Sequence, residues 1–341
     1  MYSFKSDYSE GCHPRILKTM VSSNLLQSDG YGLDIYSQEA IKILKQRLNY
    51  ENIDIHFISG GTQTNLLAIA TFLRAHEAVL ATYEGHIYAD ECGSIEATGH
   101  KVVPVHSDNG KISAAMIEKA LIDHSDPFDV KIKLIYISNV SEVGTIYTKK
   151  ELQELRTCCD KNDLLLFMDG ARLGSALTST INDVSFIDLC HFFDAFYIGG
   201  TKNGALFGEA LVIVKDDLKP DFRYAYKQRG AMLAKGRLLG IQFYELFKDK
   251  LYLDLANHAN KMAMIIKEAF LKNNYRLLYD SYSNLQFPII PNHLLSKFSE
   301  KYYFNIIKKV DDNNTAVRFV TSWATTEEIV KELVNDISLI K

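Results

Sequence analysis

The chain has 341 residues, of which 47% are hydrophobic and 23% are charged. A chain of this length can bury a large core, has room for about two domains, and has the composition of an ordinary folded protein. Its 38 basic and 42 acidic side chains are well mixed and leave a net charge of -4. Because nucleic acids bind clustered Lys and Arg, this balance argues against a nucleic-acid partner.

The cysteines show no spacing typical of a metal site or of a disulfide framework: Cys12, Cys92, Cys158, Cys159 and Cys190. We therefore expect free thiols in a reducing compartment and no bound metal. No apolar run approaches the ~18 residues that a membrane span needs. The first residues also lack the apolar core of a signal peptide. We expect a cytoplasmic protein with no membrane partner.

Short apolar runs alternate with segments of helical periodicity as far as residue 214. After helices at 16–20 and 38–48, the pattern predicts strands at 53–59, 78–81, 101–105, 133–138, 164–168, 195–198 and 210–214. It predicts further helices at 62–76, 88–98, 113–122 and 149–162. Strands that alternate with helices predict an α/β fold, a mostly parallel sheet sandwiched by helices.

The pattern changes after about residue 236, where a long helical stretch covers 238–272. The remaining segments are fewer and are typical of an α+β unit: 285–289, 297–304, 316–320 and 326–340. We expect a large domain over residues 1–245, which includes an N-terminal arm, and a smaller C-terminal α+β domain over residues 246–341.

Ligands of open α/β sheets bind beyond the carboxyl ends of the strands, so the residues that follow each strand are the candidates for a site. The segment 59–63, Ser-Gly-Gly-Thr-Gln, leads into a helix whose free N–H groups suit a phosphate. Alone, such a turn is more often a simple helix cap. His86 follows another strand beside a glycine and suits ring stacking or proton transfer, although a lone His is more often structural.

Two charged residues follow later strands. Asp169 ends an apolar strand, where a carboxylate needs a partner such as a protonated ring nitrogen, unless it only caps the next turn. Lys202 lies in the glycine-rich segment 199–204, where burial would make its amine a nucleophile for carbonyl compounds. The alternative is an exposed loop lysine. A glycine turn, His, Asp and Lys follow one another as in a pyridoxal 5'-phosphate (PLP) enzyme of the aspartate aminotransferase fold.

With these residues the chain resembles the threonine aldolase / β-eliminating lyase family of PLP enzymes, which has the type I fold of aspartate aminotransferase. The likeness covers almost the whole chain. Its most specific part is Asp-Gly-Ala-Arg at residues 169–172, followed by the glycine-flanked Lys202. Further matches are Ser6-Asp7, Gly30-Tyr31-Gly32, Gly61-Thr62, His86-Ile87 and the segment 318–321, Arg-Phe-Val-Thr.

The resemblance implies a role for each residue. Lys202 would hold PLP as a Schiff base and move protons, Asp169 would keep the ring nitrogen protonated, and His86 would stack on the ring. The phosphate would lie at the turn formed by Gly61, Thr62 and Gln63. The substrate carboxylate would be held by Ser6, Arg172 and Arg318, with Arg172 also near the cofactor, because the guanidinium fork binds carboxylates. Tyr31 would lie near the site across an interface of a homodimer or homotetramer.

The chain also departs from the family. Residues 138–141 read Ser-Asn-Val-Ser where the family usually has Glu-Asn-Thr-His. The missing His is a candidate for contacting or deprotonating the substrate hydroxyl. The family's Ser-Lys is Thr201-Lys202 here. Its Gly-Gly-Gly-Met-Arg-Gln segment is replaced by residues 229–235, so the phosphate-binding cation is reassigned to Lys227, with Arg229 and Lys235 as alternatives.

The predicted function is that of a PLP-dependent aldehyde-lyase, which cleaves a β-hydroxy-α-amino acid to glycine and an aldehyde. His86 or Lys202 would take the hydroxyl proton. One alternative keeps PLP but changes the reaction to β-elimination, racemisation or transamination, and is motivated by the altered residues around Ser141. The other alternative is a non-catalytic relative that binds a phosphate ligand. The presence of both Lys202 and Asp169 argues against it.

Overall fold

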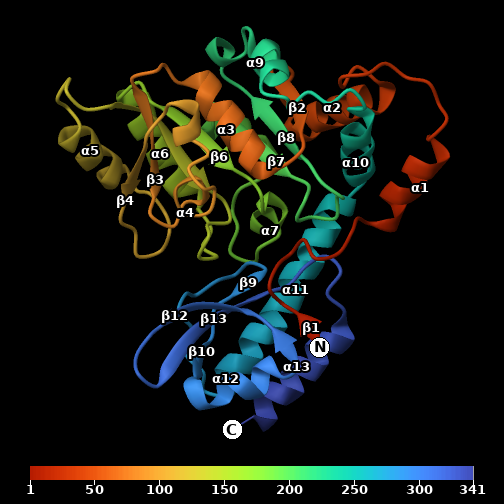
Figure 1. Ribbon diagram of the computed structural model, residues 1–341, viewed down its shortest axis with the longest axis vertical. Coiled ribbons are helices and arrows are strands. Elements are labelled where there is room, and N and C mark those ends of the chain that lie inside the picture. Colours follow the sequence, from red (N-terminus) through yellow and green to blue (C-terminus); the bar gives the residue numbers. More distant parts are fainter. Residues whose placement is uncertain (341) are drawn as a thin grey trace.

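The structure is a computed structural model, and it describes residues 1–340. A seven-stranded sheet with helices on both faces forms the larger part, and a smaller part with its own antiparallel sheet follows. The 22-residue helix α11 (Leu251–Lys272) runs from one part to the other (Figure 1). This architecture confirms the predicted α/β fold class with a C-terminal α+β region.

The large sheet has the strand order β2-β8-β7-β6-β5-β3-β4. Five adjacent strands of this sheet run parallel to one another: β4 (Val102–Val105), β3 (Glu77–Thr82), β5 (Lys131–Ser138), β6 (Leu165–Asp169) and β7 (Ala195–Gly199). The strand β8 (Glu209–Ile213) runs antiparallel to both β7 and β2 (Asp54–Ile58). Because of this direction, β8 begins at the edge where β7 ends, and Glu209 pairs with Gly199.

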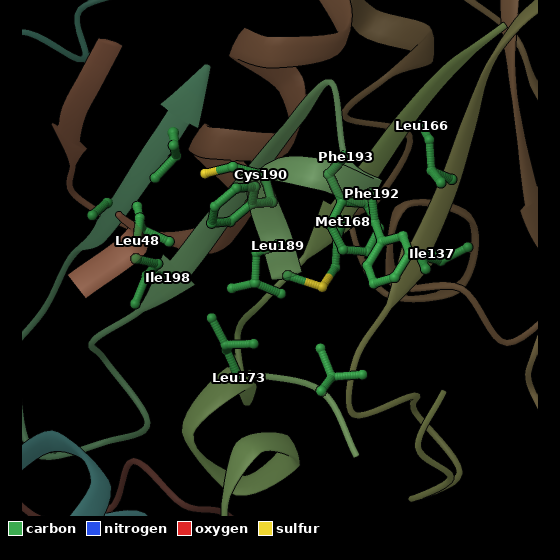
Figure 2. Packing of buried hydrophobic residues seen from close by; sticks show 14 of the residues in the cluster. Leu48, Ile137, Leu166, Met168, Leu173, Leu189, Cys190, Phe192, Phe193 and Ile198 are labelled. Atoms are coloured by element: carbon green, nitrogen blue, oxygen red, sulfur yellow. The ribbon is translucent and has the colours of Figure 1, made fainter. Parts of the chain in front are cut away.

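Side chains of the central strands alternate between two hydrophobic clusters, one on each face, as the period of a strand requires. In β6, Leu166 and Met168 pack into the cluster drawn in Figure 2, whereas Leu165 and Phe167 pack into the other. The first face is covered by α2 (Ile35–Leu48), α5 (Ala114–Asp123), α6 (Lys149–Lys161), α8 (Phe186–Phe192) and α10 (Arg237–Phe247). The second is covered by α3 (Gly61–Phe72), α4 (His86–Ala89) and α9 (Phe222–Gln228).

The smaller part is built on β13 (Asn314–Val320), which pairs with β9 (Leu285–Gln286), β10 (Ile289–Pro291) and β12 (Asn305–Lys309). The helices α11, α12 (Asn292–Ser299) and α13 (Glu327–Leu339) share its core. The first strand, β1 (Tyr2–Ser3), pairs in parallel with β11 (Tyr302–Tyr303), so the first residues lie against this part (Figure 1). The division of the chain into residues 1–245 and 246–341 stays a prediction.

Three predicted helices are wrong in extent. The helix predicted at 62–76 ends at Phe72. The segment 88–98 holds only the last two residues of α4 and a short 3-10 turn, η1 (Glu96–Thr98), because Cys92 and Gly93 have positive φ values of 52° and 72° that interrupt a helix. The stretch 238–272 is two helices, α10 and α11, and Asp249 between them accepts a hydrogen bond from the Leu251 N–H. The short helices α7 (Leu173–Leu177), α8 and α9 were not predicted, because so few residues carry little periodicity.

The remaining elements are α1 (Pro14–Ser22) and the 3-10 turn η2 (Asp216–Leu218). No helix within residues 1–340 is both long enough and apolar enough to cross a membrane.

Candidate active site

A cavity of about 540 Å³ lies where β5, β6 and β7 end. Most of the residues predicted for the site line it together: Gly61, Thr62, His86, Asp169, Arg172, Lys202 and Arg318. Six of these residues lie at or just after the ends of strands of the large sheet. The seventh, Arg318, belongs to β13 of the smaller part. The cavity therefore lies between the two parts of the molecule.

Lys202 lies in the loop after β7, and no hydrogen bond or ion pair of its Nζ is found within residues 1–340. Burial lowers the pKa of Lys202, and the positive charge of Arg172 lowers it further, although the carboxylates of Asp7 and Asp169 act in the opposite direction. A lysine with a lowered pKa offers a neutral amine closer to neutral pH. Such an amine can attack a carbonyl group.

The loop that carries Lys202 is anchored by Glu209 at the start of β8. The Thr201 hydroxyl donates to Glu209 Oε1 at 2.8 Å, and the Gly200 N–H donates to Oε2 at 2.9 Å. Burial raises the pKa of Glu209. This residue lines the cavity but was not predicted.

Asp169 is the last residue of β6 and is surrounded by donors. Tyr136 Oη donates to its Oδ2 at 2.7 Å, Asn65 Nδ2 donates to Oδ2 at 3.1 Å, and the Ala171 N–H donates to Oδ1 at 2.9 Å. Burial pushes the pKa of Asp169 upward, but hydrogen bonds from Tyr197 and Tyr136 outweigh it, and the net pKa is lowered. The side chain therefore remains a carboxylate and suits a cationic ring nitrogen.

His86 opens α4 and is held at two points. Its ring Nδ1 lies 2.8 Å from Glu91 Oε1, which also accepts from Asn65 Nδ2 at 2.8 Å. Its backbone N–H donates to Glu142 Oε1 at 3.0 Å. The hydrogen bond with Glu91 raises the pKa of His86, although burial opposes it. The orientation of the ring is thus fixed by residues around it.

The glycine turn after β2 leaves the N-terminus of α3 open. Gly60 caps this helix without any side-chain hydrogen bond, so the first N–H groups of α3 have no partner in the helix. A Cβ atom on Gly60, which lines the cavity, would meet no other atom within 4 Å. The open space and the helix N-terminus together suit a phosphate. Gln63 does not line this cavity, and its Oε1 accepts from Ser59 Oγ at 2.5 Å.

Two arginines make one end of the cavity positive. Arg172 forms a two-point ion pair with Asp7, with Nε–Oδ2 and Nη2–Oδ1 distances of 2.7 and 3.1 Å. Asp7 is in turn held by Asn284 Nδ2 at 2.9 Å. Arg318 has a buried Nε without a hydrogen-bond partner in the described chain. Since an unpaired buried donor is costly, this end of the cavity favours an anionic ligand such as a carboxylate.

Several predicted residues lie outside the cavity of this single chain. The Ser6 hydroxyl pairs with that of Ser9 at 2.9 Å. Tyr31 is 42% exposed, and the Lys227 ammonium lies 4.4 Å from the centre of its ring. Neither Arg229 nor Lys235 lines the cavity among the described residues. The roles predicted for these residues remain predictions.

The sequence analysis missed two residues that line the cavity, Glu142 and Glu209, and the role of Asp7, which binds Arg172 beside it. Glu209 is the first residue of the antiparallel strand β8, and only residues at or after the ends of strands had been considered. Glu142 comes directly after the segment 138–141, which starts at the end of β5. A search for charged residues a few positions further along this loop would have identified it. Asp7 belongs to a segment that had been matched to the family, but nothing near it in the sequence points to Arg172 as its partner.

Comparisons with known proteins agree with this geometry. The model of a family described as beta-eliminating lyase matches residues 4–287. A low specificity L-threonine aldolase of Pseudomonas aeruginosa is 29% identical, over 99% of this chain and 97% of its own. The solved structure of a Leishmania major threonine aldolase is 46% identical, with a TM-score of 0.99 and coverage of 100% of both chains.

A histidinol-phosphate aminotransferase from Clostridium acetobutylicum is only 13% identical, over 100% of this chain and 99% of its own, with a TM-score of 0.76. That likeness shows an aminotransferase-like fold. The family match covers most of the chain, and it agrees with the lysine, the aspartate and the glycine turn that meet in the cavity. The chain belongs to the β-eliminating lyase family.

Proposed function

We propose that this protein is a PLP-dependent aldehyde-lyase of the low-specificity L-threonine aldolase type, which cleaves a β-hydroxy-α-amino acid to glycine and an aldehyde. The observation that carries the proposal is that Lys202, Asp169 and Arg318 line one cavity. The full-length relatives from P. aeruginosa and L. major are threonine aldolases, which supports the predicted reaction type.

The residues of the cavity fit PLP at each of its ends. Lys202, an amine whose pKa is lowered, would bind the aldehyde, the Asp169 carboxylate would face the ring nitrogen, and the N–H groups at the open start of α3 would bind the phosphate. His86, which is anchored by Glu91 and Glu142, would cover the ring. When bound, the cofactor supplies an electron sink for negative charge that develops at the substrate Cα.

The residues of the chain orient the substrate and move its protons. Arg318, with its unpaired buried Nε, binds the substrate carboxylate, and Arg172 adds positive charge beside it. Because a held carboxylate restricts rotation at Cα, this contact selects the bond that breaks. Lys202, whose pKa is lowered by burial, delivers the proton that Cα takes up after the Cα–Cβ bond has broken.

We also propose a homodimer or homotetramer in a reducing compartment, the cytoplasm. Apolar side chains crowd the surface around α1 and the loop to α2, with exposed fractions of 76% for Val21, 93% for Leu25 and 69% for Ile35. Tyr31 lies on the same loop, so a neighbouring copy seated there would be close to the residue predicted to act across an interface. The five cysteines are all free thiols.

The test is product analysis. The purified protein with PLP should release glycine and acetaldehyde from L-threonine, and Lys202→Ala should abolish both glycine release and the visible absorption of the bound cofactor. The control Lys119→Ala changes an exposed lysine on α5 and should leave both unchanged. Formation of ammonia and a keto acid in place of glycine would show β-elimination and contradict the proposal.

A further inference from the structure

The segment after β5 brings a carboxylate into the cavity at a position that the sequence analysis did not consider. Position 141, where the family has His, is occupied by a fully buried serine whose hydroxyl pairs with Thr145 Oγ1 at 2.7 Å. Ser141 is not among the residues that line the cavity, whereas the next residue, Glu142, lines it together with His86, Asp169 and Lys202.

One oxygen of Glu142 is anchored. Its Oε1 accepts from Ser138 Oγ at 2.6 Å and from the His86 N–H at 3.0 Å. Within residues 1–340, both hydrogen bonds that other residues make to this carboxylate end on Oε1. The Glu142 backbone N–H also contacts the carboxylate. Other residues hold the side chain by Oε1 alone, so Oε2 is the oxygen that can meet a ligand in the cavity.

The surroundings of Glu142 make its carboxylate more basic than an ordinary glutamate. Burial raises the pKa of Glu142, and the negative charge of Asp169 raises it further, although the Ser138 hydrogen bond acts in the opposite direction. The other titratable groups that face it are Arg172, Tyr136, Tyr147 and His86. A carboxylate with a raised pKa is a stronger base than an ordinary glutamate.

We propose that Glu142 is a further catalytic residue, whose Oε2 takes the proton of the substrate β-hydroxyl. The proposal rests on the proposed function. The hydroxyl O–H bond breaks, its proton goes to Glu142, and its electron pair becomes the second bond of the aldehyde C=O. The Cα–Cβ bond breaks, and its electron pair stays with the Cα fragment, which takes up a proton from Lys202 and leaves as glycine, while Lys202 regains a proton from water. Glu142 then returns its proton to water.

The experiment compares two reactions of Glu142→Gln. One is cleavage of phenylserine, followed by benzaldehyde absorption, and the other is exchange of the glycine Cα proton in deuterated water, which involves no hydroxyl group. Glutamine keeps an acceptor for Ser138 and His86 but cannot take a proton. We expect cleavage to fall by about 10²- to 10⁴-fold, as for loss of a general base. Glycine exchange should stay within about threefold of wild type.

Two further readouts separate catalysis from folding. Glycine binding, measured by the change in cofactor absorption, and the melting temperature should both stay close to wild type in Glu142→Gln. The control Glu118→Gln changes an exposed carboxylate on α5 and should leave every readout unchanged. If Glu142→Gln fails to fold, Glu142→Asp replaces it, and should retain glycine exchange while cleavage falls.

The pH profile gives an independent check. Because the pKa of Glu142 is raised, its carboxylate takes a proton as the pH falls through this raised value. Wild-type cleavage should therefore decline on the acid side, whereas glycine exchange should lack this limb. Equal losses of cleavage and exchange, or unchanged cleavage, would refute the catalytic role. A wild-type protein that exchanges glycine without cleaving phenylserine would overturn the proposed function, and the role of Glu142 with it.

Discussion

Lys202 and Asp169 reach the protonation states that their proposed roles need by different physical means. Burial disfavours the charged form of both side chains. Lys202 has no hydrogen-bonded partner to oppose this effect among the described residues, so its pKa is lowered. Asp169 has several donors that do oppose it, so it remains charged although it is buried.

The lowered pKa of Lys202 predicts how the cofactor-free protein takes up PLP. Only the neutral amine attacks an aldehyde, and a lowered pKa keeps the amine neutral down to a lower pH. The rate of uptake, followed by visible absorption, should therefore reach half its maximum at a pH below the ordinary lysine value of about 10.4. A midpoint near that ordinary value would contradict the environment described for Lys202.

The central strands bring the site together because their last residues share one face. In β5, β6 and β7, the side chains of Tyr136, Phe167 and Tyr197 point to the cluster that contains α3. Asp169 lies two positions after Phe167, so the period of the strand places it on the same face, where Asn65 of α3 and Tyr136 reach it. A shift of one residue in β6 would turn Asp169 away from all of them.

The close approach of β6 and β7 predicts the effect of Gly170→Ala. A Cβ atom at this position would lie 1.9 Å from the Tyr197 carbonyl oxygen, and the Gly199 N–H donates to the Gly170 carbonyl at 3.0 Å, so the strands cannot separate freely. We expect a loss of about 1–3 kcal/mol or more in the free energy of unfolding, measured by urea denaturation.

The control is Gly11→Ala, whose Cβ would have its nearest contact at 4.0 Å from Leu206 Cδ1. It should change the free energy of unfolding by less than about 0.5 kcal/mol. Equal stability of the two variants would show that β6 can shift to accept a side chain.

The elements differ in how well the sequence predicts them. The strands of the large sheet are continuous apolar runs, so their positions were predicted to within a few residues, and His86, Asp169 and Lys202 were found because they follow such strands. Glu209 was missed because β8 runs in the opposite direction. The pairing of Asp7 with Arg172 depends on contacts between distant parts of the chain, which no local pattern reveals.

At the scale of the whole molecule, the surface around α1 exposes many apolar side chains in a single chain. Its exposed apolar residues include Leu17, Val21, Leu25, Leu26, Leu33 and Ile35. Exposed apolar patches of this kind mark interfaces. In addition, none of the candidate phosphate-binding cations lines the cavity among residues 1–340. Both observations support the proposed homo-oligomer.

The proposed interface predicts that Leu25→Glu shifts the protein toward the monomer, because a buried unpaired charge is costly. Light scattering after size-exclusion chromatography measures the mass. Phe128→Glu is the matched control, since Phe128 is 97% exposed but lies before β5, away from α1. A wild-type protein that is already monomeric, or equal effects of both variants, would argue against this interface.

The pairing of β1 with β11 has a consequence for the order in which the protein becomes functional during synthesis. Phe4 is buried with Phe298 and Phe319, and Asp7 follows it, so the partner of Arg172 is seated only after the C-terminal sheet exists. Arg318 is also synthesised late, because it lies near the C-terminus. Because domains form from the N-terminus as the ribosome proceeds, we expect a nascent chain to capture its vitamin-derived coenzyme before it can retain an amino acid. We therefore expect no turnover of amino acids on unfinished chains.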